Sequence, residues 1–266
     1  MILFLGVKNE PNQKWLAYTS YCALDQDTRR PVAGFIIFNE GKVSYTDGDY
    51  HAQLSTFIHE VLHALFFHPT LFKTFPKNSN GKSFLFQDVD SKWKIRGDTI
   101  LKVSRDYFNC QTLNGIPLEN DGGSTSAGAH FEKVFFADEM MTPDDTLEIN
   151  LSRFSLAVAK DSGFFQVNMD KGENIFWGKN EGCGFFEQSC KITEIDEFCS
   201  KDETVSCSDN LMFRTQCHSS QFTNTCKINL HFESCKTQKK SNEVFEKYGR
   251  NSLCLNTIVK IIFILI

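Results

Sequence analysis

The feature that most constrains this chain is the pentapeptide HEVLH at His59–His63, which lies inside an apolar run from Leu54 to Phe67. In a helix, two histidines four positions apart project from one face about one turn apart, so both imidazoles can bind one metal ion. Glu60 lies roughly 100° around the helix from His59 and can take a proton from a water that the metal activates. The pentapeptide therefore predicts a metal site with hydrolytic chemistry.

The surrounding sequence supports the helix that this site needs. Pro69 is expected to end the helix just past His68, and Ser55 or Thr56 could contribute near its start. Apolar residues recur at helical spacing: Leu54, Ile58, Val61, Leu62 and Leu65. The pentapeptide alone also arises by chance, in about one average chain in a hundred. A third ligand is therefore needed to establish the site.

Composition narrows the class of protein. With 266 residues, of which 41% are hydrophobic, the chain can bury a sizeable core, most plausibly one catalytic unit plus an appendage. The net charge of -5 and the absence of a large Lys/Arg cluster give no electrostatic basis for nucleic-acid binding. We therefore expect no nucleic-acid partner.

The cysteines indicate an oxidising compartment. The chain has 10 cysteines, and no Cys-x-x-Cys pair of the kind that zinc ribbons need occurs near the C-terminus. Eight lie in the last third, mostly seven to ten residues apart: Cys183, Cys190, Cys199, Cys207, Cys217, Cys226, Cys235 and Cys254. Disulfides are the better interpretation, and a secreted or cell-surface location follows. The glycosylation sequon Asn150–Ser152 is compatible with that location.

The two ends lead us to expect an incomplete chain. Met1–Val7 is too short for the apolar core of a signal peptide, and no export signal is visible. Thr257–Ile266 is almost wholly apolar, but Lys260 interrupts it and it is shorter than the roughly 20 residues that cross a bilayer. This segment would be a clipped hydrophobic tail, a remnant of a lipid-anchor signal or a buried strand.

Sequence patterns predict a small sheet before the metal helix. Trp15–Cys22 alternates apolar and polar residues, and Val32–Phe38 is β-branched and aromatic, so both are predicted strands. Turn residues at Pro76–Lys82 precede a further alternating stretch at Phe84–Val89.

The second half is predicted to be helical and irregular. A helix is expected over Thr99–Phe108, and a glycine-rich loop at Glu119–Ala129 leads into His130. A later helix, with Gly163 as its C-terminal cap, is marked by one apolar face: Leu147, Leu151, Phe154 and Val158.

Five further histidines compete to be the third ligand: His51, His68, His130, His218 and His231. His68 directly precedes Pro69 and points away from the ligand face, so a helix-end or surface role is favoured by about three to one. His51 lies two turns from His59. The last two lie among the cysteines and are expected at the surface.

Several separated segments resemble the leishmanolysin family, metzincin-type zinc endopeptidases of cell surfaces. The likeness extends in order from about Trp15 to Cys235, which is far more specific than the pentapeptide. The segments that carry it are His59–Leu65, Asp106–Cys110, Pro117–Asn120, Gly122–Gly123, Gly128–Glu132, Asp138–Thr142, Asp161–Asn168 and Trp177–Lys179.

This resemblance implies a role for each site residue. Three histidines would bind Zn²⁺: His59, His63 and His130. Glu60 would be the catalytic residue, and Met141 the methionine beneath the metal, where a soft thioether fills space without competing as a hard ligand. Its neighbour Met140 would be an ordinary core residue.

The resemblance also implies the architecture. We expect an α+β fold: a metzincin-like catalytic domain with a small twisted sheet, an active-site helix and a mostly helical or irregular second half, followed by a disulfide-rich C-terminal appendage. Residues 1–68 would hold the active-site helix, 69–184 the third ligand and the methionine turn, and 185–266 the cysteine-rich region with the apolar tail. Cys110 would pair with Cys183, and Cys22 would need a partner upstream of Met1.

One position departs from the family pattern. Metzincin helices usually carry glycine three residues after the second histidine, whereas this chain has Phe66. A bulky residue does not adopt a left-handed conformation at low cost. We therefore expect the helix to run on through Phe67 to Pro69.

The expected function is that of a zinc-dependent endopeptidase acting on proteins or peptides, extracellular or membrane-associated at the cell surface. Glu60 would act as general base and then as general acid. The substrate would lie extended against an edge strand, which we expect within Gly41–Tyr50.

Two other functions remain open. A non-catalytic adhesion or binding module could keep the fold and the zinc, but it needs no acid–base residue at Glu60, so catalysis is favoured by about four to one. An inactive fragment would retain no zinc.

Overall fold

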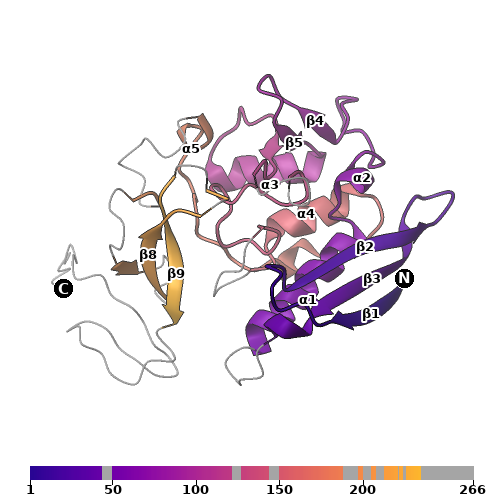
Figure 1. Ribbon diagram of the computed structural model, residues 1–266. Helices are drawn as coiled ribbons and strands as arrows, with labels where there is room; N and C mark the ends of the chain where they lie inside the picture. Colours follow the sequence, from indigo (N-terminus) through magenta and orange to yellow (C-terminus); the bar gives the residue numbers. More distant parts are fainter. Residues whose placement is uncertain are drawn as a thin grey trace. The chain divides into compact units, whose positions relative to one another are not determined.

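The computed structural model describes residues 1–43, 50–121, 127–143, 150–187, 197–199, 205–207, 213–220, 222–223 and 226–234. Figure 1 shows its helices and strands, coloured along the sequence. The chain divides into two compact units, and each is described by itself. The first comprises Met1–Asp145 and Ile149–Glu187, and the second comprises Thr146–Glu148 and Gln188–Ile266. The domain boundaries expected from the sequence stay predictions.

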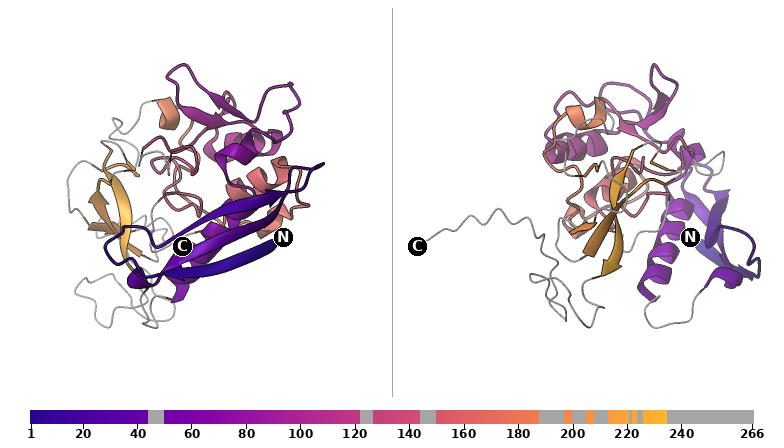
Figure 2. Two further views of the ribbon diagram at one scale, coloured as in Figure 1. Left: turned by 45° about the vertical axis from the view of Figure 1, so that its right-hand side comes forward. Right: turned by 60° about the vertical axis from the view of Figure 1, so that its left-hand side comes forward.

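A three-stranded sheet opens the first unit. Its strands are β1 (Ile2–Lys8), β2 (Ala17–Leu24) and β3 (Pro31–Asn39). The order is β1-β3-β2, with β1 parallel and β2 antiparallel to the central β3. Helix α1 (Tyr50–Leu65) contacts β2 and β3 and lies against one face of the sheet in both views of Figure 2. The strands predicted at Trp15–Cys22 and Val32–Phe38 are confirmed as β2 and β3.

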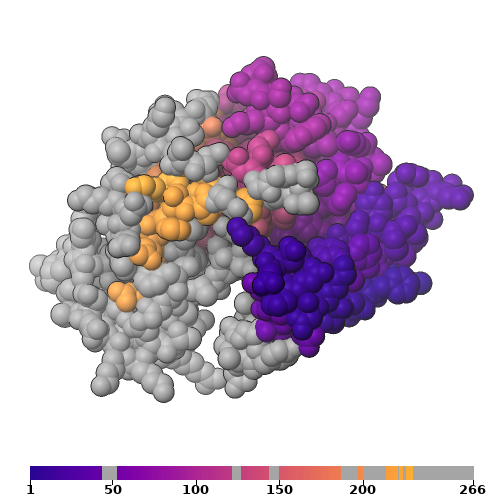
Figure 3. All heavy atoms as spheres, viewed as in Figure 1, coloured from indigo at the N-terminus to yellow at the C-terminus, as the bar shows by residue number. Residues whose placement is uncertain are grey.

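Strand β1 was not predicted. Its apolar side chains point to solvent on both faces, with Ile2, Phe4, Leu5 and Val7 each more than half exposed. Figure 3 shows this first segment, in indigo, on the surface of the molecule. Without an apolar–polar alternation, the segment lacks the pattern of a half-buried strand.

Short helices and a second small sheet complete the first unit. Strands β4 (Leu85–Gln87), β5 (Trp93–Ile95) and β6 (Ile116–Pro117) pair antiparallel in that order. The helices and 3₁₀ turns are η1 (Glu40–Lys42), α2 (Pro69–Phe72), α3 (Asp98–Phe108), α4 (Arg153–Asp161), η3 (Met169–Lys171) and α5 (Gly184–Glu187).

Both helices predicted in this half are present. Helix α3 confirms the prediction at Thr99–Phe108 and ends at Asn109, which adopts the left-handed conformation. Helix α4 begins later than predicted because Ser152 caps it, accepting a hydrogen bond from the Phe154 N–H. Leu147, which was expected on the apolar face of this helix, lies outside the described residues. Gly163, the expected C-terminal cap, follows the helix and has a positive φ of 73°.

An aromatic core joins these elements. Phenylalanines that are at most 1% exposed make up most of it: Phe67, Phe72, Phe84, Phe108, Phe131, Phe136, Phe154 and Phe185. Phe131 contacts Phe67 on one side and Phe136 on the other, at centroid distances of 4.9 Å in each case. Edge-to-face and offset pairs of this kind add to the free energy gained by burying their area. The core therefore fixes the residue directly after His130.

Helix α4 caps helix α3. The residue before α3 is Gly97, which has no side chain to accept from the first backbone N–H groups. Asp161, the last residue of α4, accepts from Thr99 N at 2.9 Å and from Ile100 N at 2.8 Å. A Cβ at position 97 would collide with the Asp161 carboxylate. Glycine at position 97 therefore lets a distant carboxylate act as the cap.

We expect Asp161→Ala to lower the free energy of unfolding by about 1–2 kcal/mol, because two backbone donors at the start of α3 lose their acceptor. Denaturant unfolding measures the change. Asp106→Ala is the matched control: its carboxylate pairs with Lys102 on the exposed face of α3, and its loss should cost less than about 0.5 kcal/mol. Equal effects of the two substitutions would contradict the capping role.

Disulfides occur in both units. Cys110 and Cys183 are bonded in the first unit, with 4.8 Å between their Cα atoms. The second unit contains an antiparallel sheet of β7 (Val205–Cys207), β8 (Phe213–His218) and β9 (Ile228–Ser234), and a Cys199–Cys217 disulfide. Cys22 is a free, exposed cysteine on β2. Among the described residues, no helix is both long and apolar enough to span a membrane.

Candidate metal centre

Three imidazoles converge in the first unit. His59 and His63 come from α1, and His130 comes from a segment 67 residues further along the chain. The Nε2 atoms lie 3.0 Å apart for His59–His63, 3.1 Å for His63–His130 and 3.3 Å for His59–His130. In a tetrahedral zinc site, ligand nitrogens at about 2.1 Å from the metal lie about 3.4 Å from one another. The three nitrogens are therefore close to the spacing that one ion requires.

Backbone carbonyls orient the two histidines of α1. His59 Nδ1 donates to the Met140 carbonyl at 2.6 Å, and His63 Nδ1 donates to the Phe67 carbonyl at 2.7 Å. A neutral imidazole that carries its proton on Nδ1 presents a lone pair at Nε2. Lone pairs that face one another at about 3 Å repel unless a cation lies between them. The donor set thus fits a metal ion.

Burial favours the neutral form of these histidines. It lowers the pKa of His59, and it lowers the pKa of His63 well below its usual range, with the charges of His59 and His130 as the next causes. Neutral imidazole is the form that binds metals.

The segment that carries His130 is held by backbone hydrogen bonds. Glu119 N–H donates to the His130 carbonyl at 2.9 Å, and Phe131 N–H donates to the Met141 carbonyl at 2.8 Å. Gly128, two residues before the histidine, has a φ of 76°, and its N–H donates to the Glu119 carbonyl at 2.7 Å. A positive φ favours glycine, so this residue turns the chain toward the metal centre.

Helix α1 ends earlier than predicted. The expectation that it runs through Phe67 to Pro69 is wrong: its last residue is Leu65, and the N–H groups of both Phe66 and Phe67 donate to the Leu62 carbonyl at 2.9 Å. Phe66 has no positive φ, because the chain leaves the helix without a left-handed residue. Both phenylalanines are buried, so packing supplies the termination that glycine would otherwise give.

The competing histidines lie elsewhere. His68 caps α2: its Nδ1 accepts from Thr70 N at 3.3 Å. This matches the helix-end role that the sequence favoured. His218 is exposed at the end of β8, and the side chains of His51 and His231 lie outside the described residues.

Glu60 and Met141 lie in the interior. Glu60 follows His59 in α1 and is only 7% exposed. Met141 is fully buried, and its carbonyl accepts from the residue after His130. Sequence reasoning assigned Met140 to the core alone, but its carbonyl also orients His59.

Glu139 organises the turn that contains these methionines. Its carboxylate accepts hydrogen bonds from the Met141 N–H, from Ser152 Oγ at 2.9 Å and from Ser155 Oγ at 2.6 Å. Burial raises the pKa of Glu139 to about 7, and hydrogen bonds from these donors act in the opposite direction. Local sequence patterns do not reveal this role, because the two serines are 13 and 16 residues away from Glu139.

This raised pKa has a measurable effect on stability. Folded Glu139 keeps its proton up to about pH 7, whereas the unfolded chain releases it near 4.5, so the free energy of unfolding falls as pH rises between these values, by up to about 3 kcal/mol. Glu139→Gln cannot ionise and should lack this decrease. Denaturant unfolding at about pH 5 and pH 7.5, at fixed zinc, measures it. Equal decreases in both proteins would show that Glu139 is already ionised in the fold.

A second cluster of titratable groups lies in the two backbone segments that pair next to His130. The carboxylates of Glu119, Asp121 and Glu132 come within 4.8 Å of one another. Burial raises the pKa of Glu132 to about 8, with the charge of Glu119 as the next cause, and burial raises the pKa of Glu119 to about 7. The sequence analysis placed Glu119 and Glu132 in segments that support the family resemblance and Asp121 in the glycine-rich loop, and it assigned none of them to a site.

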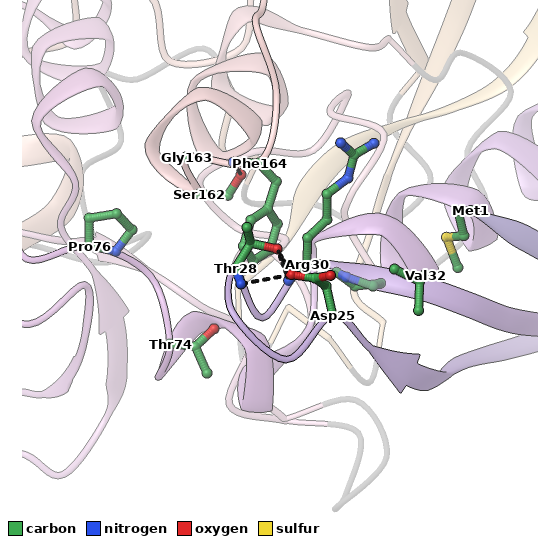
Figure 4. Close-up of a pocket in the computed structure, with 11 residues that line it drawn as sticks. Met1, Asp25, Thr28, Arg30, Val32, Thr74, Pro76, Ser162, Gly163 and Phe164 are labelled. Carbon is green, nitrogen blue, oxygen red and sulfur yellow. Dashed lines mark hydrogen bonds between the residues drawn. The ribbon is translucent and has the colours of Figure 1, made fainter.

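A cavity of about 590 Å³ lies apart from both clusters. It is lined by Met1, Asp25, Thr28, Arg30, Pro31, Val32, Thr74, Pro76, Ser162, Gly163 and Phe164. Figure 4 shows these side chains, with the Asp25–Thr28 hydrogen bonds at the turn between β2 and β3. None of the predicted site residues lines it.

Comparisons with known proteins point to one family. The model of the family Leishmanolysin matches residues 1–255. A leishmanolysin-like peptidase of Drosophila melanogaster is 30% identical over 231 residues, covering 70% of this chain and 34% of the relative. One from Caenorhabditis elegans is 31% identical over 212 residues, covering 66% and 32%. Leishmanolysin of Leishmania donovani is 27% identical over 194 residues, covering 71% and 32%. The chain thus spans about a third of the length of these relatives.

Proposed function

Since this chain belongs to the leishmanolysin family of peptidases, we propose that it is a zinc-dependent metalloendopeptidase. The observation that carries the proposal is the convergence of three Nε2 atoms, each within 3.3 Å of the other two. In this proposal His59, His63 and His130 hold the zinc ion and leave one position open. Bound zinc supplies a Lewis acid, which polarises a peptide carbonyl and acidifies water.

Glu60 is proposed to move the proton. It follows His59 in the helix and is only 7% exposed, and partial shielding from solvent strengthens the electrostatic interactions of a carboxylate. Its carboxylate would accept a proton from the attacking water and then deliver it to the amine of the leaving peptide. Met141, buried beside the His130 segment, would fill the space beneath the imidazoles.

The peptide is proposed to bind along β2. This strand is an edge of its sheet, so its outer backbone groups can pair with an extended peptide. Tyr21 of β2 reaches the region just past α1, where its hydroxyl lies 2.6 Å from Thr70 Oγ1. The described part of Gly41–Tyr50 does not contain the expected edge strand: η1 occupies Glu40–Lys42 and α1 begins at Tyr50, and residues 44–49 lie outside the described residues.

Extracellular or cell-surface action on protein or peptide substrates is part of the proposal. The two described disulfides, Cys110–Cys183 and Cys199–Cys217, favour an oxidising compartment. A non-catalytic adhesion module is the alternative. Glu60, which is buried and directly follows His59 in the chain, favours catalysis, because a binding module has no use for an acid–base group there.

The test is zinc content and peptide cleavage by the full chain. Metal is removed with a chelator and zinc is added back, and cleavage of a peptide library is followed by mass spectrometry. We expect one zinc per chain, loss of cleavage on chelation and its return with zinc. A protein that binds zinc but cleaves nothing would support the adhesion module, and a folded protein that binds no zinc would contradict both functions.

A further inference from the structure

The acidic cluster Glu119, Asp121 and Glu132 is buried with little positive charge around it: Lys92 favours the charged form of Glu132, but in the described residues it forms no ion pair with the cluster. Glu119 is fully buried and Glu132 is 5% exposed, yet their carboxylates and that of Asp121 lie within 4.8 Å of one another. The ion pairs recorded among the described residues, Lys94–Asp88 and Lys102–Asp106, do not involve the cluster. Carboxylates brought together away from water must either take up protons or bind a positive partner.

Two oxygens of the cluster are buried without a donor. Within the described part of the chain, nothing donates to Glu132 Oε1 or to Asp121 Oδ2. Both oxygens of Glu119 have donors: Oε1 accepts from the Asp121 N–H at 2.7 Å, and Oε2 accepts from the Lys133 N–H at 3.4 Å. Glu132 Oε2 accepts from Asn120 Nδ2 at 3.5 Å. Buried acceptors that lack donors are costly, and a bound cation would satisfy both.

We propose that Glu119, Asp121 and Glu132 form a second metal site that takes a hard dication such as Ca²⁺ and braces the segment carrying His130. The cluster offers oxygen ligands alone, the set that Ca²⁺ prefers, whereas zinc favours nitrogen and sulfur. Calcium–oxygen distances of about 2.3–2.6 Å place opposed ligands up to about 5 Å apart, which matches the observed 4.8 Å limit.

The bracing follows from the backbone between the two sites. Leu118 and Phe131 form an antiparallel bridge, flanked by hydrogen bonds from Glu119 N–H to the His130 carbonyl and from Glu132 N–H to the Pro117 carbonyl. A cation held by Glu119 and Glu132 would cross-link the two sides of this ladder. The effect on the zinc site rests on the proposed function, but calcium binding itself does not.

The test is a calcium titration of the full chain at saturating zinc, which keeps the three histidines occupied. Calorimetry should show one Ca²⁺ per chain, and the Tm should rise by about 5–10 °C at a hundredfold excess over Kd. Glu132→Gln and Asp121→Asn should each abolish the calcium heat and the Tm rise. The control Asp170→Asn, on an exposed side chain, should behave like the wild type.

Two results would overturn the site: no calcium heat in the wild-type protein at millimolar Ca²⁺, or unchanged calcium binding in Glu132→Gln. Without a cation, Glu132→Gln would relieve like-charge repulsion and raise the Tm, whereas with one it lowers the Tm in calcium. If Glu132→Gln does not fold, the calcium titrations of the wild-type protein and of Asp121→Asn show whether the site binds calcium. Calcium binding without peptide cleavage would support the calcium site and contradict the proposed function. Peptide cleavage without calcium binding would support the proposed function and contradict the calcium site.

Discussion

Glu60→Gln is expected to lower kcat by about 10²–10⁴-fold while the protein keeps its full zinc content. Glutamine has nearly the same shape as glutamate, so α1 and its two histidines should stay in place. It cannot accept a proton at neutral pH, so neither water activation nor protonation of the leaving amine can pass through residue 60. The effect should appear in kcat more than in KM, because the lost interaction belongs to the transition state.

The measurement is peptide cleavage by the two proteins at equal zinc content. Glu181→Gln, which neutralises an exposed glutamate, is the matched control and should leave kcat unchanged. Equal activity in wild type and Glu60→Gln would remove Glu60 from the mechanism. Loss of zinc along with activity would indicate that Glu60 shapes the site rather than moving the proton.

The sequence predicted the parts of this molecule that follow local rules. The spacing of His59 and His63 within an apolar run predicted the helix that carries them, and alternation predicted β2 and β3. The end of α1 was predicted wrongly: the helix stops at Leu65, where both following phenylalanines are buried in the core. Tertiary packing of this kind leaves no local signal.

Sequence spacing could not have brought the third histidine to the other two. His130 reaches them through a backbone ladder and a positive-φ glycine, and the two elements of the site are 67 residues apart. Family resemblance supplied that pairing. The Glu119–Glu132 cluster shows the same limit more strongly: its members come from two segments, and their burial, which gives the cluster its chemistry, is a property of the fold.

His130→Ala is expected to weaken zinc binding by more than about 100-fold and to abolish peptide cleavage at limiting zinc. Substitutions of groups that merely orient a ligand cost 10–100-fold in metal affinity, so the loss of a ligand itself should exceed that range. Two imidazoles four residues apart on one helix would remain, and they cannot enclose an ion that needs three protein ligands. The fold should persist, because Phe131, which follows the histidine, still anchors the segment in the aromatic core.

Zinc affinity measured by competition with a chromogenic chelator reports the effect directly, and circular dichroism checks that the fold is retained. His218→Ala, which removes an exposed histidine at the end of β8, is the matched control and should bind zinc as the wild type does. A folded His130→Ala protein that holds stoichiometric zinc with wild-type affinity would show that the third imidazole is not a ligand. The short Nε2 distances to His59 and His63 would then reflect packing alone, and the proposed catalytic centre would lose its basis.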